Sequence, residues 1–121
     1  MSRPVGPYSP VLRAGDFVVA SGQVGLAPGE SPPRLVDGGT AAELRQALAN
    51  LAGVLESEGA TLDDVVKTTL FLADMADYPA ANEVWTEVFS EHRPTRSTVA
   101  VAALPLGARA EVEAWAYAPR G

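Results

Sequence analysis

The feature that most constrains the fold is a pair of apolar runs near the C-terminus, in the stretch around residues 93–117. The runs cover residues 97–103 and 110–118, and a short Leu-Pro-Leu-Gly-Ala connector separates them. Apolar runs of this length, bounded by Pro and Gly, are typical of β-strands. The sequence therefore predicts that the two runs pair as a β-hairpin.

The second run alternates in character, as expected of a strand with two different faces. One face has small apolar side chains, namely Val112, Ala114 and Ala116, and the other has Glu111, Glu113, Trp115 and Tyr117. By the same alternation, Arg96 and Thr98 share a face of the first run. We therefore expect a guanidinium and a carboxylate to meet over one patch of the sheet. This expectation depends on the register, because a slip of one residue would turn Glu111 to the other side.

The composition excludes several kinds of chemistry. The chain has 121 residues, which predicts one domain over residues 1–121. It has no cysteine and one histidine, which excludes disulfides, thiolate chemistry and most zinc sites. A net charge of −6 argues against a nucleic-acid surface. The sequence shows neither a membrane-spanning apolar stretch nor a signal peptide, so we expect no membrane partner and a cytoplasmic location.

Leucines at helical spacing predict a helix over residues 40–58. They are Leu44, Leu48, Leu51 and Leu55. Thr40 and Glu43 have the spacing of a capping box, in which each side chain binds the backbone amide of the other residue. Gly59 supplies a left-handed stop after the helix.

The remaining segments complete a β-β-α-β-α-β-β order. They are a hairpin of residues 11–13 and 16–21, a loop of residues 22–39, a central strand of residues 65–73, and a second helix of residues 77–92. Alternation places Val66 on the same strand face as Thr68, and Asp77 is expected to cap the second helix. This order predicts an α+β fold with one mixed sheet and two helices packed on one face. The opposite face keeps Trp115 and Tyr117 uncovered, which predicts self-association through it.

Six segments together, in this order, resemble the RidA/YjgF family of small homotrimeric enamine and imine deaminases. They are GPYS (6–9), ASGQVGL (20–26), the stretch 45–75, YPAANEVW (78–85), RPTRSTV (93–99) and ALPLGARAEVEAWA (103–116). The resemblance extends over nearly the whole chain. It implies a single RidA-like domain with a chorismate-mutase-like fold and a trimer whose sheets form a central barrel. It also implies three ligand sites in the clefts between subunits.

The resemblance further implies roles for individual residues. Arg96 would grip the carboxylate of a 2-imino acid, and Glu111 would position or activate the attacking water. Thr98 stands where the family often has Cys, so a hydroxyl would have to serve there in catalysis. Further substrate-binding positions are Tyr8, Ser21, Gly22 and Asn82. Pro10 replaces a frequent Gln, which should alter the entrance of the cleft. No metal and no cofactor is implied.

These residue types suit the reaction for physical reasons. Arg presents a planar, permanently charged fork that binds a carboxylate with two hydrogen bonds, which Lys cannot do. A Glu within reach of a water can take its proton and later protonate the leaving amine. Glu113 is also open to a structural role, as the partner of Arg109 or of an Arg in a neighbouring subunit.

Three readings of the function remain open from the sequence. The leading one is hydrolysis of 2-imino and enamino acids to 2-keto acids and ammonia. A second is a non-catalytic trimer that binds small carboxylates, as a metabolite sensor or a holdase. A third is a pathway-specific deaminase or hydrolase of the same fold. RNA cleavage, an activity with which some relatives are labelled, is disfavoured by the acidic charge and the single histidine.

Overall fold

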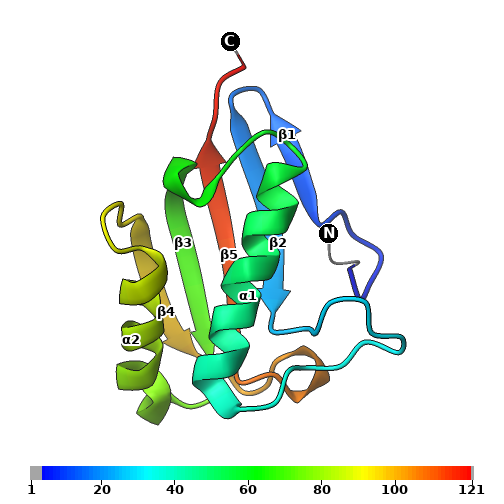
Figure 1. The fold of residues 1–121 in the computed structure, drawn as a ribbon, viewed down its shortest axis with the longest axis vertical. Helices are drawn as coiled ribbons and strands as arrows, with labels where there is room; N and C mark the ends of the chain where they lie inside the picture. The colour runs from blue at the N-terminus through cyan, green and yellow to red at the C-terminus, as the bar shows by residue number, and fades with distance from the viewer. Residues whose placement is uncertain (1–3, 121) are drawn as a thin grey trace.

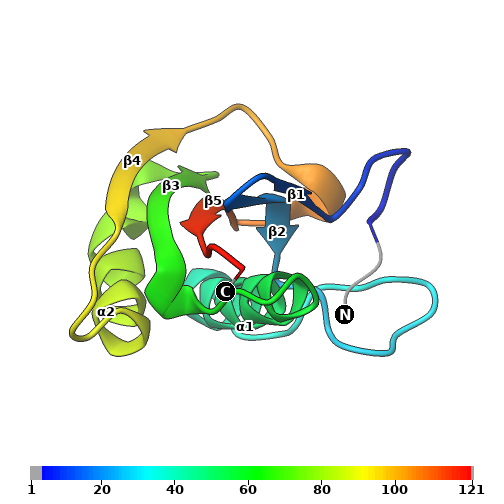
Figure 2. The same cartoon turned by 90° about the horizontal axis from the view of Figure 1, so that it is seen from above.

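The computed structural model describes residues 4–120. Within them the chain forms β1 (Val11–Ala14), β2 (Phe17–Val24), α1 (Gly39–Glu56), β3 (Val65–Leu72), α2 (Tyr78–Val88), β4 (Thr95–Ala100) and β5 (Ala110–Tyr117). The strands make one mixed sheet in the order β1-β2-β5-β3-β4 (Figure 1). Both helices cover the same face of that sheet (Figure 2). The predicted α+β class and order of elements are therefore confirmed.

The predicted hairpin between the two C-terminal runs is wrong. β4 pairs in parallel with β3, with Arg96 opposite Thr68, whereas β5 pairs antiparallel with both β2 and β3. β3 therefore lies between the two runs. The cause is α2, because a helical crossover returns the chain in the direction of the strand it left and so permits parallel pairing. Residues 101–109 then carry the chain past β3 to begin β5.

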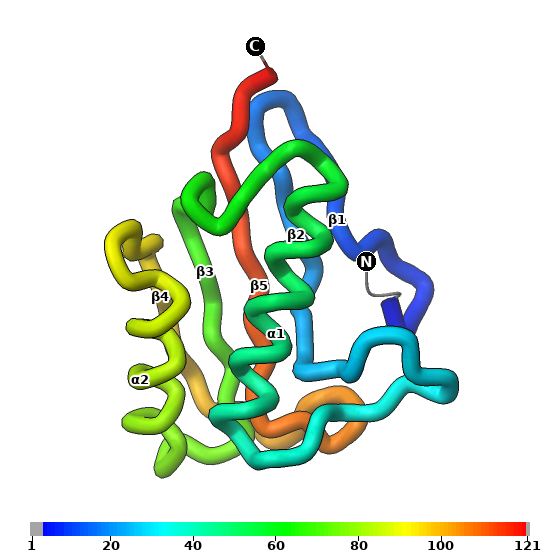
Figure 3. Tube along the Cα trace, viewed as in Figure 1, coloured from blue at the N-terminus to red at the C-terminus, as the bar shows by residue number. Residues whose placement is uncertain are grey.

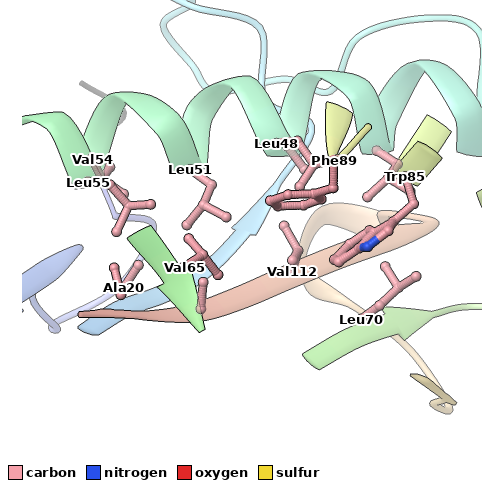
Figure 4. Packing of buried hydrophobic residues seen from close by; sticks show 14 of the residues in the cluster. Ala20, Leu48, Leu51, Val54, Leu55, Val65, Leu70, Trp85, Phe89 and Val112 are labelled. Carbon is pink, nitrogen blue, oxygen red and sulfur yellow. The ribbon is translucent and has the colours of Figure 1, made fainter. Parts of the chain in front are cut away.

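The core lies between the sheet and α1. Leu48, Leu51 and Leu55 of α1 belong to one apolar cluster with Leu70 of β3 and Val112 of β5 (Figure 4). These five side chains are at most 1% exposed. The helical spacing of the leucines thus meets the apolar face of the alternating strands, and this burial supplies the main driving force for the fold.

The predicted capping box at the start of α1 is wrong. Gly38 is the N-cap, in the left-handed conformation at φ 117°, and no side chain caps the helix there. The hydroxyl of Thr40 instead donates to Asp77, and Glu43 accepts from the backbone amide of Arg109. Both side chains are therefore used to tie α1 to elements that are distant in the sequence.

The hydrogen-bond and ion-pair partners of Asp77 and Arg109 also differ from the predicted ones. Asp77 precedes α2 but its side chain makes no capping hydrogen bond. Its carboxylate lies 3.5 Å from the guanidinium of Arg109, so Arg109 pairs with Asp77 rather than with Glu113. The start of β5 is thereby joined to the starts of both helices.

Some boundaries move from their predicted places. β2 runs through Val24, so the long connection to α1 covers residues 25–38 and projects beside the helix (Figure 3). A bulge between Val65 and Lys67 shifts the alternation of β3, which leaves Val66 42% exposed instead of aligned with Thr68. α2 ends at Val88, earlier than expected. Gly59 adopts the predicted left-handed conformation, at φ 81°.

We expect Leu51→Ala to lower the free energy of unfolding by about 2–5 kcal/mol, because Leu51 is fully buried and its truncation leaves a cavity under α1. Urea unfolding followed by circular dichroism measures the change. Glu56→Ala, at an exposed position of the same helix, is the control and should change the free energy by less than about 0.5 kcal/mol. Equal effects of the two substitutions would contradict this packing of α1 on the sheet.

Candidate active site

Arg96 is held by side chains of α2, on the helix-covered face of the sheet. Its Nη2 donates to Oδ1 of Asn82 at 2.8 Å and to the hydroxyl of Tyr78 at 3.3 Å. Its guanidinium carbon lies 4.9 Å from the ring centroid of Trp85 and 5.5 Å from that of Tyr78. Among residues 4–120, Nε and Nη1 of Arg96 have no hydrogen-bond partner. The guanidinium is therefore fixed on one side and has donors left for an anion.

These contacts show which side chains of α2 hold Arg96. Asn82, which the resemblance implies as a substrate-binding position, orients Arg96 through its amide oxygen. Neither Tyr78 nor Trp85 was predicted from the sequence as a site residue. Their spacing was the available signal, since residues 78, 82 and 85 fall on one face of a helix. Tyr78, Asn82, Trp85 and Arg96 are called the Arg96 cluster below.

Glu111 lies on the opposite, helix-free face of the sheet. Its neighbours on β5, Ala110 and Val112, are fully buried in the core, so alternation turns Glu111 away from the helices. The carboxyl group borders a cavity of about 30 Å³. Other residues lining that cavity include Tyr8, Gly22, Gln23 and Pro105. A space of this size holds one or two water molecules.

The pKa of Glu111 is raised above the ordinary value of a glutamate. The larger cause is burial, which disfavours the charged form, and the second is the nearby carboxylate of Glu113. A carboxyl group whose pKa is raised towards neutrality exchanges a proton with water more readily, which is a property of general acids and bases. Perturbed groups of this kind concentrate at functional sites.

Ser21 and Tyr8 belong to the same region as Glu111. The hydroxyl of Ser21 donates to the carbonyl of Ser9 at 2.6 Å, and its backbone amide donates to the carbonyl of Pro10 at 2.9 Å. Ser21 therefore fastens the N-terminal segment that carries Tyr8, whose side chain is half exposed at the cavity. Tyr8, Ser21, Gly22 and Glu111 are called the Glu111 cluster below.

Thr98 lies apart from the Glu111 cluster. It is opposite Leu70 in the parallel register, so it shares the helix-covered face with Arg96. Its hydroxyl oxygen is buried and has no hydrogen-bond partner among residues 4–120. This geometry gives Thr98 no contact with the cavity at Glu111.

The Arg96 cluster and the Glu111 cluster do not meet within the chain. Arg96 and Glu111 project from opposite faces of the sheet, and β3 separates their strands. The expectation that they share one patch of sheet is therefore wrong, because it assumed that the two strands were neighbours. The structure instead has a guanidinium with free donors on one face of the sheet and a carboxyl group beside a water-sized cavity on the other.

The described part of the chain has neither a metal-binding cluster nor a membrane-spanning helix. Within residues 4–120 no group of three or more His, Cys, Asp or Glu side chains is arranged to hold a metal ion. Over the same range, none of the helices has the length and apolar character needed to cross a membrane.

The fold and the two clusters define a small α+β protein with a candidate site for a carboxylate-bearing molecule. A family model described as Endoribonuclease L-PSP matches residues 1–118. The chain therefore belongs to this family, which is the RidA/YjgF family.

Relatives of the chain carry two kinds of name. A 2-iminobutanoate/2-iminopropanoate deaminase of Mus musculus is 45% identical over 91% of this chain and 80% of its own length. A RutC family protein of Pyrococcus horikoshii is 40% identical over 95% of this chain and 90% of its own length.

Solved structures share the fold. The yeast protein YEO7 superposes with a TM-score of 0.90 at 39% identity, over 98% of this chain and 91% of that one. E. coli TdcF with bound serine gives a TM-score of 0.86 at 32% identity, over 98% of this chain and 91% of that one.

We expect Glu111→Gln to unfold at a higher urea concentration than the wild type at pH 7. The pKa of Glu111 is raised in the folded state, so its contribution to stability is complete below the unfolded pKa and is lost as the pH rises through the folded pKa. Gln carries no charge at either pH, so the advantage of the variant should disappear below about pH 4.

Urea unfolding at both pH values measures this effect. Glu83→Gln, on the exposed surface of α2, is the control and should not produce the same pH-dependent difference. A wild type that is more stable than Glu111→Gln at pH 7 would contradict the raised pKa.

Proposed function

We propose that this protein hydrolyses 2-imino acids, and the enamino acids in equilibrium with them, to 2-keto acids and ammonia. The observation that carries the proposal is Glu111, a carboxyl group with a raised pKa beside a cavity of the size of one or two waters. The Arg96 cluster supports it by offering a fixed guanidinium with free donors. Relatives at 40–45% identity that are named 2-iminobutanoate/2-iminopropanoate deaminase point the same way.

Arg96 binds the substrate carboxylate in this proposal. Asn82 and Tyr78 occupy Nη2, and the ring of Trp85 supports the guanidinium from the side. Nε and Nη1 then donate to the two carboxylate oxygens, which places the neighbouring C=N carbon at a fixed distance from the guanidinium. Asn82, Tyr78 and Trp85 act on the substrate through Arg96.

Glu111 transfers the protons in this proposal. It takes a proton from the water as the oxygen bonds to the C=N carbon and passes that proton to the nitrogen, which becomes an amine. It then takes the proton of the new hydroxyl group as the C=O bond forms and gives it to the amine as the C–N bond breaks, so that ammonia leaves. Water is added, ammonia is released, and the carboxyl group ends as it began. General acid and base catalysis of this kind contributes roughly 10²–10⁴-fold.

A complete site requires two subunits, because Arg96 and Glu111 lie on opposite faces of one sheet. We propose a homotrimer in which the Arg96 cluster of one subunit faces the Glu111 cluster of the next. The helix-free face supports association, since the rings of Phe17, Trp115 and Tyr117 gather there and remain 38–48% exposed. The bound serine of TdcF is consistent with a site for small molecules that carry a carboxylate.

A second candidate is carboxylate binding without catalysis. The Arg96 cluster by itself is sufficient to bind a small carboxylate, and the family includes proteins under other names, such as RutC. RNA cleavage is not proposed, although the family description names it. The chain has a net charge of −6, and a ring nitrogen of its single histidine, His92, lies 2.6 Å from the carbonyl oxygen of Val65.

We expect the wild type to accelerate ammonia release from 2-iminopropanoate, generated in place by a dehydratase that acts on serine. Arg96→Ala should raise KM, and Glu111→Gln should lower kcat by roughly 10²–10⁴-fold while the affinity for a 2-keto acid is retained. Glu83→Ala is the surface control. Equal rates of ammonia release with the wild type, with both variants and without added protein would remove the proposal.

Subunit complementation tests the shared site. Arg96→Ala and Glu111→Gln are co-expressed with different affinity tags, and mixed oligomers are purified through both tags. In a trimer that contains both variants, one of the three interfaces pairs an intact Arg96 from one subunit with an intact Glu111 from the next. The doubly purified trimers should therefore regain about a third of wild-type activity. A mixture with no more activity than the separate variants would show that the site does not cross the interface.

A further inference from the structure

The strand that carries Gly22 is bulged beside Glu111. β2 and β5 pair regularly up to Ala20, opposite Ala114, and pairing resumes with Gln23 opposite Val112. Two residues of β2, Ser21 and Gly22, are therefore opposite one residue of β5, Glu113. Bulges of this kind change the direction of neighbouring groups and are frequent next to active sites.

The bulge brings the Cα atom of Gly22 against the carboxyl group of Glu111. A Cβ atom built on Gly22 would lie 2.8 Å from Cδ, 2.9 Å from Oε1 and 3.1 Å from Cγ of Glu111. Real Cβ atoms essentially never approach other heavy atoms as closely as 2.8 Å. The backbone of Gly22 is outside the left-handed region, so its conformation alone does not require glycine. Glycine is required at position 22 because no space is left there for a side chain.

We propose that Gly22 is a positioning residue for Glu111. The carboxyl group of Glu111 occupies the space that a side chain at position 22 would fill, and this fixes where the attacking water is held. The inference rests on the proposed hydrolysis and assigns Gly22 a role distinct from that of a backbone contact to substrate. An alanine at position 22 keeps the backbone amide and carbonyl, so a backbone contact would survive the substitution. The position of the Glu111 carboxyl group would change.

The added methyl group should move the side chain of Glu111 rather than the backbone. All three atoms it would meet belong to the flexible outer part of that side chain. Gly25 provides the contrast, because a Cβ there would lie 2.5 Å from the backbone oxygen of Glu43. A substitution at Gly25 would have to displace the β2–α1 connection from α1, whereas one at Gly22 only has to turn a carboxyl group.

We expect Gly22→Ala to lower kcat for imine hydrolysis by about 10²-fold, the effect of misplacing a catalytic group by about 1 Å. KM should change by less than about threefold, since Arg96 is untouched. Gly53→Ala is the matched control, because a Cβ built on Gly53 would meet no atom within 4 Å apart from the nearby backbone of α1 itself, and Gly53 does not line the cavity. It should leave kcat unchanged. A Gly22→Ala enzyme with wild-type kcat would overturn the assignment.

Shortening the acid tests the contact itself. Asp is one methylene shorter than Glu, so Glu111→Asp withdraws the carboxyl group from the added methyl. We expect Glu111→Asp to reduce kcat strongly in the wild-type background, but to reduce it much less, or to raise it, in the Gly22→Ala background. The two substitutions should therefore be non-additive by more than about threefold. Additive effects would overturn the proposal.

A readout that needs no activity separates this inference from the proposed function. We expect the carbon NMR titration midpoint of the Glu111 carboxyl to fall in Gly22→Ala, because a carboxyl group displaced from its seat regains water. A midpoint that does not fall would overturn the positioning role even in an active enzyme. A midpoint that falls in a protein without deaminase activity would support the steric contact and remove only the hydrolytic function.

Folding of the variant is checked by circular dichroism. If Gly22→Ala does not fold, then folding restored by Gly22→Ala/Glu111→Asp supports the contact. A double variant that stays unfolded would overturn it, because the added methyl would then meet something other than the Glu111 side chain.

Discussion

The pairing of β3 decides the layout of this molecule. β3 bonds to β4 in parallel on one side and to β5 in antiparallel fashion on the other. Because side chains alternate along a strand, these two registers send Arg96 to the helix-covered face and Glu111 to the open face. The chain therefore keeps the Arg96 cluster and the Glu111 cluster apart. Under the proposed function, a cleft that uses both residues would be completed by another subunit, which would link catalysis to assembly.

Each cluster is held by contacts that exclude water or restrict motion. Arg96 is fixed by an amide oxygen, a hydroxyl and an indole ring, so little side-chain entropy remains to be lost when an anion binds. Glu111 is seated against Gly22 in partial burial, which destabilises its charged form and raises its pKa. That burial lowers the stability of the folded protein near neutral pH. Under the proposed function, the same burial would prepare the carboxyl group for proton transfer, as is common at functional sites.

Polar contacts between residues that are far apart in the sequence connect the Arg96 cluster and the Glu111 cluster. Arg109, two residues before Glu111, donates its backbone amide to the buried Glu43 and pairs with Asp77. Asp77 directly precedes Tyr78, a member of the Arg96 cluster. The start of β5 and the start of α2 are thus tied through α1. Sequence reasoning assigned Thr40, Glu43 and Asp77 to helix caps, because local spacing fits that role equally well and long-range partners leave no local signal.

Periodicity was enough to predict the order of elements and the buried faces of α1 and β5, and the resemblance to a family named Arg96 and Glu111 as candidates. These are local properties, which can be read from short stretches of the chain. Folding in three dimensions settled that β4 pairs with β3, that Tyr78 and Trp85 support Arg96, and that Gly22 leaves room for a carboxyl group. Strand partners and close approaches depend on segments that are far apart in the chain, and a single strand's pattern fits more than one neighbour. For that reason Arg96 and Glu111 could be named from the sequence as candidates, whereas their separation onto opposite faces could not be predicted.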